Sequence, residues 1–145
     1  MRGKPRRGRG RGEDGQALVE LSLCASFLVL VLLAVWQVGT VFSNYIDLSE
    51  AARAGARAAA LSGAPSVAGD TASFTTAQSE GQFAASQSAS VPGMAVTISS
   101  VTPWMAGARV RATVTAPYSL TLFGVSVSSG TINVTDDMRV HRLGA

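Results

Sequence analysis

The segment from Leu21 to Phe42 is apolar almost throughout and contains no proline. Ala, Leu and Val dominate it, and all three are common in helices that are surrounded by lipid. At about 1.5 Å of rise per residue, twenty such residues span roughly 30 Å, the hydrocarbon thickness of a bilayer. The sequence therefore predicts a transmembrane helix over residues 16–42, continued by an amphipathic helical extension over residues 43–61.

Positive charge is concentrated in residues 1–15, here called the leader. The leader holds six Lys and Arg residues against two acidic ones, a net charge of +4, whereas the other 130 residues carry −1. Basic residues next to a membrane helix usually stay in the cytoplasm, so we expect the N-terminus inside and the C-terminal part outside. An Arg- and Gly-rich leader could also contact RNA phosphates, but it has no aromatic side chain on which bases stack, and we expect no nucleic-acid partner.

One acid, Glu20, lies at the entrance of the apolar run. A carboxylate at the centre of a membrane helix costs about 2.5–3.5 kcal/mol on insertion scales, although near the edge it can reach the headgroups. Glu20 is therefore either a tolerated interfacial residue or a residue with a partner. Its presence, and an apolar run longer than the usual 7–15 residues, also disfavour a cleaved secretory signal.

Gly15, followed by Gln16-Ala17-Leu18-Val19-Glu20 and then the apolar helix, resembles the processing site of type IV prepilins. The resemblance implies that a prepilin-type peptidase of the membrane cuts between Gly15 and Gln16. It also implies that Glu20, the fifth residue of the mature chain, pairs with the new N-terminal amine of a neighbouring subunit during assembly. Such a pairing makes physical sense, because neither charge is tolerable in lipid without a partner.

A second motif, Ala52-Arg53-Ala54-Gly55-Ala56-Arg57, follows the apolar run. Together the two motifs resemble the TadE-like family, the pseudopilins of tight-adherence (Flp-type) pilus systems. The resemblance covers about a third of the chain, Gly15 to Leu61. The residue after the glutamate is usually aromatic in that family, and here it is Leu21.

This resemblance implies a pseudopilin or minor pilin in the bacterial cytoplasmic membrane, with a single pass, the N-terminus inside and the C-terminal domain outside. Its expected partners are the membrane, the peptidase, other pilin or pseudopilin subunits, and a pilus assembly platform driven by a cytoplasmic ATPase. The alternative is a plain single-pass anchor that carries an extracytoplasmic binding domain without a pilus role. Glu20 discriminates, because a plain anchor gains nothing from an acid at that position.

The amphipathic extension has a stripe of small residues, and such a stripe allows another backbone to approach closely. The stripe could pack against the chain's own outer domain or against another subunit, and both interpretations stay open. Glu50 and Arg53 have the spacing of an ion pair along a helix. The stripe consists of Ala51, Ala52, Gly55, Ala56 and Ala59.

Residues 62–93 are rich in Ser, Ala and Gly and predict either a linker or a second helix. The helix would run from about Thr71 to Ser90, with Asp70 as its N-cap, and Gly81 would weaken it. We expect its packing residues to be Ala77, Phe83, Ala84 and Ala85.

Residues 94–145 change to a period of two, which predicts strands. Strands are expected from Val96 onward, over Arg109–Thr115, over Ser119–Val127 and over Thr131–Thr135. A hairpin loop is expected at Thr102–Gly107 and a turn at Ser128–Gly130. The predicted fold is a membrane-anchored α+β protein with a small antiparallel sheet of three or four strands, one face of which packs on the outer helix.

No motif in the chain indicates catalysis. His141 is the only histidine and has no nucleophile motif near it, Asp136-Asp137 is an acidic pair without further metal ligands, and Cys24 is the only cysteine. The glycines of the leader lack the strand-and-helix setting of a phosphate loop. We therefore expect no enzyme activity, no metal, no cofactor and no small-molecule substrate.

Overall fold

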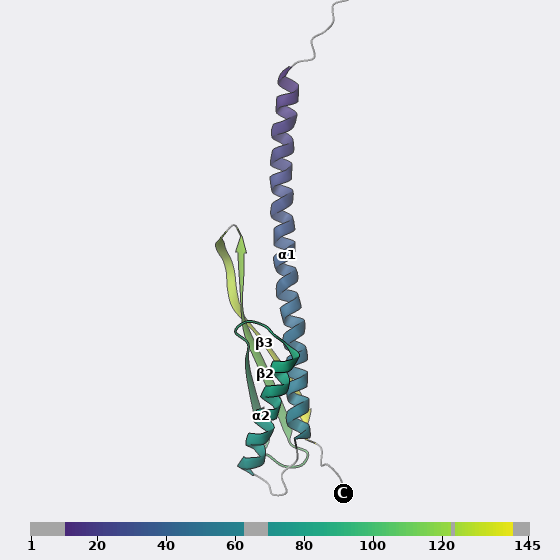
Figure 1. Ribbon diagram of the computed structural model, residues 1–145, viewed down its shortest axis with the longest axis vertical. Coiled ribbons are helices and arrows are strands. Elements are labelled where there is room, and N and C mark those ends of the chain that lie inside the picture. The colour runs from purple at the N-terminus through teal and green to yellow at the C-terminus, as the bar shows by residue number, and fades with distance from the viewer. Residues whose placement is uncertain (1–10, 63–69, 123, 141–145) are drawn as a thin grey trace, which may run out of the picture. The chain divides into compact units, whose positions relative to one another are not determined.

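The computed structural model describes residues 11–62, 70–122 and 124–140, in which two helices precede three strands (Figure 1). The helices are α1 (Arg11–Leu61) and α2 (Thr71–Ser88), and the strands are β1 (Ala95–Ser100), β2 (Arg109–Leu122) and β3 (Val125–Arg139). The strands form one antiparallel sheet in the order β1-β2-β3, so the predicted α+β class is confirmed. Residues 1–10 of the leader, the turn-rich segment 63–69 and His141 lie outside the described residues.

The chain divides into two compact units, residues 1–37 and residues 38–145. The described part of the first unit is the N-terminal half of α1, and its leucines are exposed on every side, for example Leu23 at 67% and Leu28 at 59%. A helix that is apolar all round is buried in a protein or spans a membrane, and the apolar window of this one is not buried by the protein. Among the described residues, α1 is thus the one helix with an apolar stretch long enough for a membrane span.

The hydroxyls of the two serines inside the apolar run are satisfied within the helix itself. Ser22 Oγ donates to the Val19 carbonyl at 2.8 Å, and Ser26 Oγ donates to the Ser22 carbonyl at 2.8 Å. Hydrogen bonds of this kind remove the cost of placing a hydroxyl in lipid.

In the second unit, α1 and α2 contribute to cores on one face of the sheet. Side chains of β2 alternate between buried and exposed, so that Val110, Ala112 and Val114 are buried and Arg109 and Arg111 are exposed. The buried face forms two apolar clusters, both of which contain residues of α1, α2 and the sheet. The prediction that one face packs on the outer helix is therefore confirmed.

The two clusters also show in which direction β2 runs relative to α1. The first combines Ala56 and Ala59 of α1 with Val110 of β2, and the second combines Leu48 of α1 with Ala116 of β2. As β2 advances from residue 110 to residue 116, its neighbours on α1 move back from residue 59 to residue 48. β2 therefore runs antiparallel to this part of α1, and the C-terminal end of β2 points toward Val38.

α2 confirms the predicted second helix and corrects its details. The Asp70 side chain caps it by accepting a hydrogen bond from the Ala72 amide at 3.0 Å, as the sequence predicts. The helix ends at Ser88, two residues earlier than expected. Its buried residues are spaced by four, and Phe83 is 62% exposed because it lies on the opposite side of the helix. The buried residues are Ala77, Gly81 and Ala85.

The predicted strand at Ser119–Val127 is wrong, and so is the turn at Ser128–Gly130. The chain reverses at Gly124, whose φ of +80° favours glycine, so that Ser119 belongs to β2 and Val127 to β3. Ser128, Ser129 and Gly130 lie within β3, opposite Leu120, Ser119 and Tyr118. The period of two is the same on both sides of the reversal, so it could not locate the turn.

The loop that joins β1 to β2 contains the predicted Thr102–Gly107 segment, and its Trp104 closes one cluster of the core. Trp104 is only 5% exposed and packs at a tilt against Phe74 of α2, with ring centroids 5.2 Å apart. Its indole Nε1 donates to Ser73 Oγ at 2.8 Å. A buried aromatic side chain with its polar atom satisfied fixes the loop to α2.

Candidate sites along the long helix

Gly15 and Gln16, the residues of the predicted cleavage site, are the fifth and sixth residues of α1. Both are exposed, and a Cβ placed on Gly15 would meet no heavy atom within 4 Å. The first amides of a helix have no partner within it, and helix ends open at a lower free energy than helix interiors. The Gly15–Gln16 bond therefore lies where a helix is most easily unwound for a peptidase.

Glu20 is exposed in the apolar part of α1. Its neighbours Leu18, Val19 and Leu21 are 67%, 59% and 65% exposed, so nothing in the described chain covers this part of the helix. Gln16 and Glu20 are four residues apart, which places them on one face of α1, one turn from each other. A carboxylate on an apolar, uncovered surface requires either water or a cationic partner from outside the described chain.

The second motif is divided between two faces of α1. Ala52, Gly55 and Ala56 are buried, whereas Arg53 and Arg57 are exposed. A Cβ on Gly55 would lie 3.0 Å from the Gly81 carbonyl oxygen and 3.2 Å from Ala85 Cβ. The small-residue stripe therefore packs against α2 of the same chain, and the two arginines lie on the exposed side of this segment.

Gly81 has a packing role that was not predicted from the sequence. It was expected to weaken α2, but a Cβ on Gly81 would lie 2.9 Å from the Gly55 carbonyl oxygen. Glycine at both positions allows the two helix backbones to approach this closely. The spacing of Ala77, Gly81 and Ala85 was the signal, because small residues four apart lie on one helix face.

The ion pair of the described chain lies on the sheet and not on α1. Glu50 and Arg53 form no salt bridge there, whereas Arg111 and Asp137 do, with Nε–Oδ1 and Nη2–Oδ2 distances of 2.7 and 2.9 Å. The two residues are directly opposite in the β2–β3 register. The hydrogen bond from Arg111 lowers the pKa of the Asp137 carboxyl below its ordinary value.

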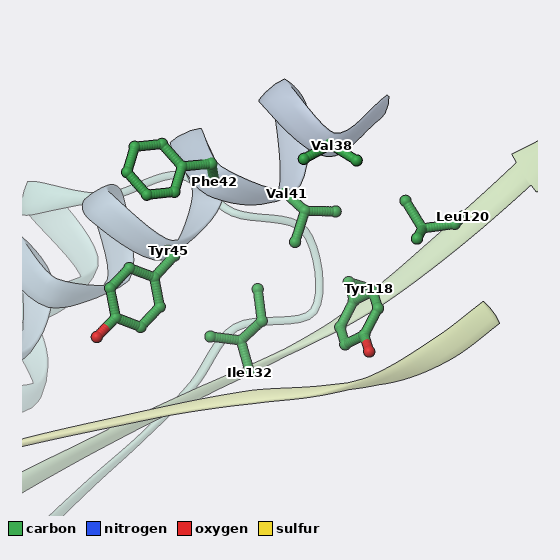
Figure 2. A pocket seen from close by; sticks show the side chains of 7 residues that line it. All are labelled: Val38, Val41, Phe42, Tyr45, Tyr118, Leu120 and Ile132. Carbon is green, nitrogen blue, oxygen red and sulfur yellow. The ribbon is translucent and has the colours of Figure 1, made fainter. Parts of the chain in front are cut away.

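An open apolar groove of about 390 Å³ lies between α1 and the β2–β3 hairpin (Figure 2). On the α1 side it is lined by Val38, Val41, Phe42 and Tyr45, and on the hairpin side by Tyr118, Leu120 and Ile132. Its only polar side-chain atoms are the two tyrosine hydroxyls. The groove was not predicted, because no local sequence pattern brings residues 38–45 next to residues 118–132.

The architecture thus defines a class of protein: a single N-terminal apolar helix, suited to membrane anchoring, whose C-terminal half packs with a small α+β domain. Residues 15–57 match a family model, described as TadE-like protein. This match confirms the resemblance that the two motifs predicted, and it extends from the glycine of the first to the last arginine of the second. No curated protein and no solved structure matches the chain.

Proposed function

We propose that this protein is a TadE-like pseudopilin or minor pilin that takes part in assembling a tight-adherence (Flp-type) pilus or a related secretion system. The observation that carries the proposal is the extent of the family match. It begins at Gly15 and ends at Arg57, so it includes the cleavage site, Glu20 and both arginines, and it leaves out α2 and the sheet.

In this proposal a prepilin-type peptidase removes the leader, and Gln16 becomes the mature N-terminus. The apolar half of α1 holds the subunit in the bacterial cytoplasmic membrane, with residues from Ser43 onward outside. Other pilin subunits and the assembly platform are the partners, and adhesion or secretion is the role of the whole machine. The subunit is not an enzyme, and it acts through contacts between helices.

Glu20 is the residue on which the proposal depends. Its carboxylate is uncovered in the described chain, among leucines and a valine that are themselves about two-thirds exposed. In lipid its natural partner is the amine of Gln16 on a neighbouring subunit. Removing one member of a buried charge pair typically costs about 3–5 kcal/mol, which lowers an association constant by two orders of magnitude or more.

The test is Glu20→Ala in the natural host. The variant is expected to insert at normal levels, because the substitution removes a charge from an apolar helix, but to lose cross-linking to pilus components and to lose pili. Glu20→Gln keeps the size of the side chain without its charge and should fail in the same way, whereas Glu20→Asp should fall between. The matched control is Glu80→Ala, which removes an exposed acid on α2.

Normal pili from the Glu20→Ala strain would contradict the assembly role and favour the plain anchor. Loss of the protein from the membrane would show a defect in insertion rather than assembly, and would also contradict the proposal. The test therefore separates the two functions by two readouts, the amount of membrane protein and the number of pili.

A further inference from the structure

The β2–β3 hairpin contains a long uncharged stretch that includes its tip. From Ala112 to Thr135 the sequence has 24 residues without Asp, Glu, Lys, Arg or His. The charged residues of these two strands are all at the opposite end of the sheet, where Arg111 pairs with Asp137. A hairpin that enters water usually carries charges near its tip, because they keep strand edges from associating.

The end of this hairpin also projects beyond the third strand. β1 pairs with β2 only between Val110 and Thr115, whereas the β2–β3 pairing continues to Leu122 and Val125 (Figure 1). Near the tip, Val125 and Val127 are 67% and 62% exposed. The projecting part is thus a two-stranded ribbon with exposed apolar side chains, an arrangement that is marginally stable in water without a cover.

The projecting ribbon lies beside the part of α1 that ends the apolar run. In Figure 2, Val38, Val41 and Phe42 of α1 and Leu120 of the hairpin line the same groove. Val38, Val41 and Phe42 are the last apolar residues before Ser43. Since β2 runs antiparallel to α1 in this unit, the hairpin advances past Tyr118 and Leu120 from the Tyr45 side of the groove toward Val38.

We propose that the tip of the β2–β3 hairpin is a second membrane contact and that the apolar groove receives a phospholipid acyl chain. One wall of the groove is the end of the candidate membrane span, so lipid at the span is continuous with the groove. Ser and Thr hydroxyls of the tip can hydrogen-bond to headgroups, and Tyr45 and Tyr118 are of the residue type enriched at the membrane surface. An uncharged tip suits contact with lipid. A site for a charged protein partner would instead carry charged side chains.

The inference rests on the membrane anchoring in the proposed function and not on the pilus role. A hairpin at the surface would hold the outer domain close to the bilayer, with the opposite end of the sheet and its Arg111–Asp137 pair turned away. Pulling such a subunit out of the membrane would then require release of the hairpin as well as of the helix.

The experiment uses the full chain in vesicles of phosphatidylethanolamine and phosphatidylglycerol. In a Cys24→Ser background, which removes the only cysteine, Val127→Cys at the tip or Leu120→Cys in the groove carries a nitroxide label. Collision rates with oxygen, which concentrates in lipid, and with a water-soluble nickel chelate report the surroundings of the label. Leu28→Cys is the lipid control and Thr97→Cys, exposed on β1, is the water control.

We expect the ratio of oxygen to nickel collisions at positions 127 and 120 to approach the ratio at position 28 and to exceed that at position 97. Nickel access at position 127 equal to that at position 97 would overturn the inference. Labels that neither reagent reaches would show a protein cover, such as a second copy, and would overturn it as well. Nickel access at position 28 would instead show that the helix is not in the membrane, which is a failure of the anchoring itself.

Discussion

The close approach of α1 and α2 at Gly55 and Gly81 offers a direct test of how the outer domain is packed. Gly81→Ala would place a Cβ 2.9 Å from the Gly55 carbonyl oxygen, 3.1 Å from Ala59 Cβ and 3.1 Å from Ile98 Cδ1. The Ile98 methyl can rotate away, but a backbone oxygen and an alanine Cβ cannot. The helices must therefore move apart by several tenths of an ångström.

Two effects of opposite sign decide the stability of Gly81→Ala. Overpacking in a core typically costs about 1–3 kcal/mol. Replacing glycine by alanine within a helix returns about 1 kcal/mol. Because the clash involves backbone, we place its cost in the upper half of the range, and the net loss of stability is then about 1–2 kcal/mol. For a domain of this size that corresponds to a decrease in Tm of roughly 5–10 °C.

The assay is thermal unfolding of the detergent-solubilised full chain, followed by near-ultraviolet circular dichroism. Trp104 is the natural reporter, since it is buried against Phe74 of α2. The matched control is Gly39→Ala on α1, also within a helix, where an added Cβ meets no heavy atom within 4 Å and no loss is expected. A Tm for Gly81→Ala at or above that of the unmodified protein would refute the close packing of the two helices.

Three further outcomes are expected. The intact mass of the native protein should be that of a chain without residues 1–15, and a protein that retains Met1 in cells with an active prepilin peptidase would contradict the cleavage. Gly15→Ala should slow this processing, because alanine stabilises the helix at the cut site by about 1 kcal/mol. Reporter fusions after Leu61 should be active only where the reporter works outside the cytoplasm, and cytoplasmic activity would reverse the orientation. The lowered pKa of Asp137 contributes stability that is present above the ordinary carboxyl pKa of 3.8 and is lost as the pH falls through the lower folded-state value. Tm should therefore decrease more in the unmodified protein than in Asp137→Asn below about pH 4, and parallel curves would contradict this.

Some features of this protein were determined by the sequence alone because they depend only on near neighbours along the chain. A membrane span needs about twenty apolar residues and no tertiary contact, so Leu21 to Phe42 predicted it directly. The cap of α2 is also local, since Asp70 accepts from an amide two residues away. The alternation in β2 was visible because one face of that strand is buried and the other is not.

The tertiary structure decided everything that depends on which segments meet. The stripe around Gly55 was compatible with a partner in another subunit or in the same chain, and only the position of Gly81 shows that α2 fills it. The period of two continues through the reversal at Gly124, so only the pairing shows that residues 109–139 form one two-stranded hairpin and not the three shorter strands that were predicted. The groove exists because β2 runs antiparallel to α1 and brings Leu120 beside Val38, residues 82 positions apart. Local patterns record the environment of a side chain, but they do not record which distant residue provides it.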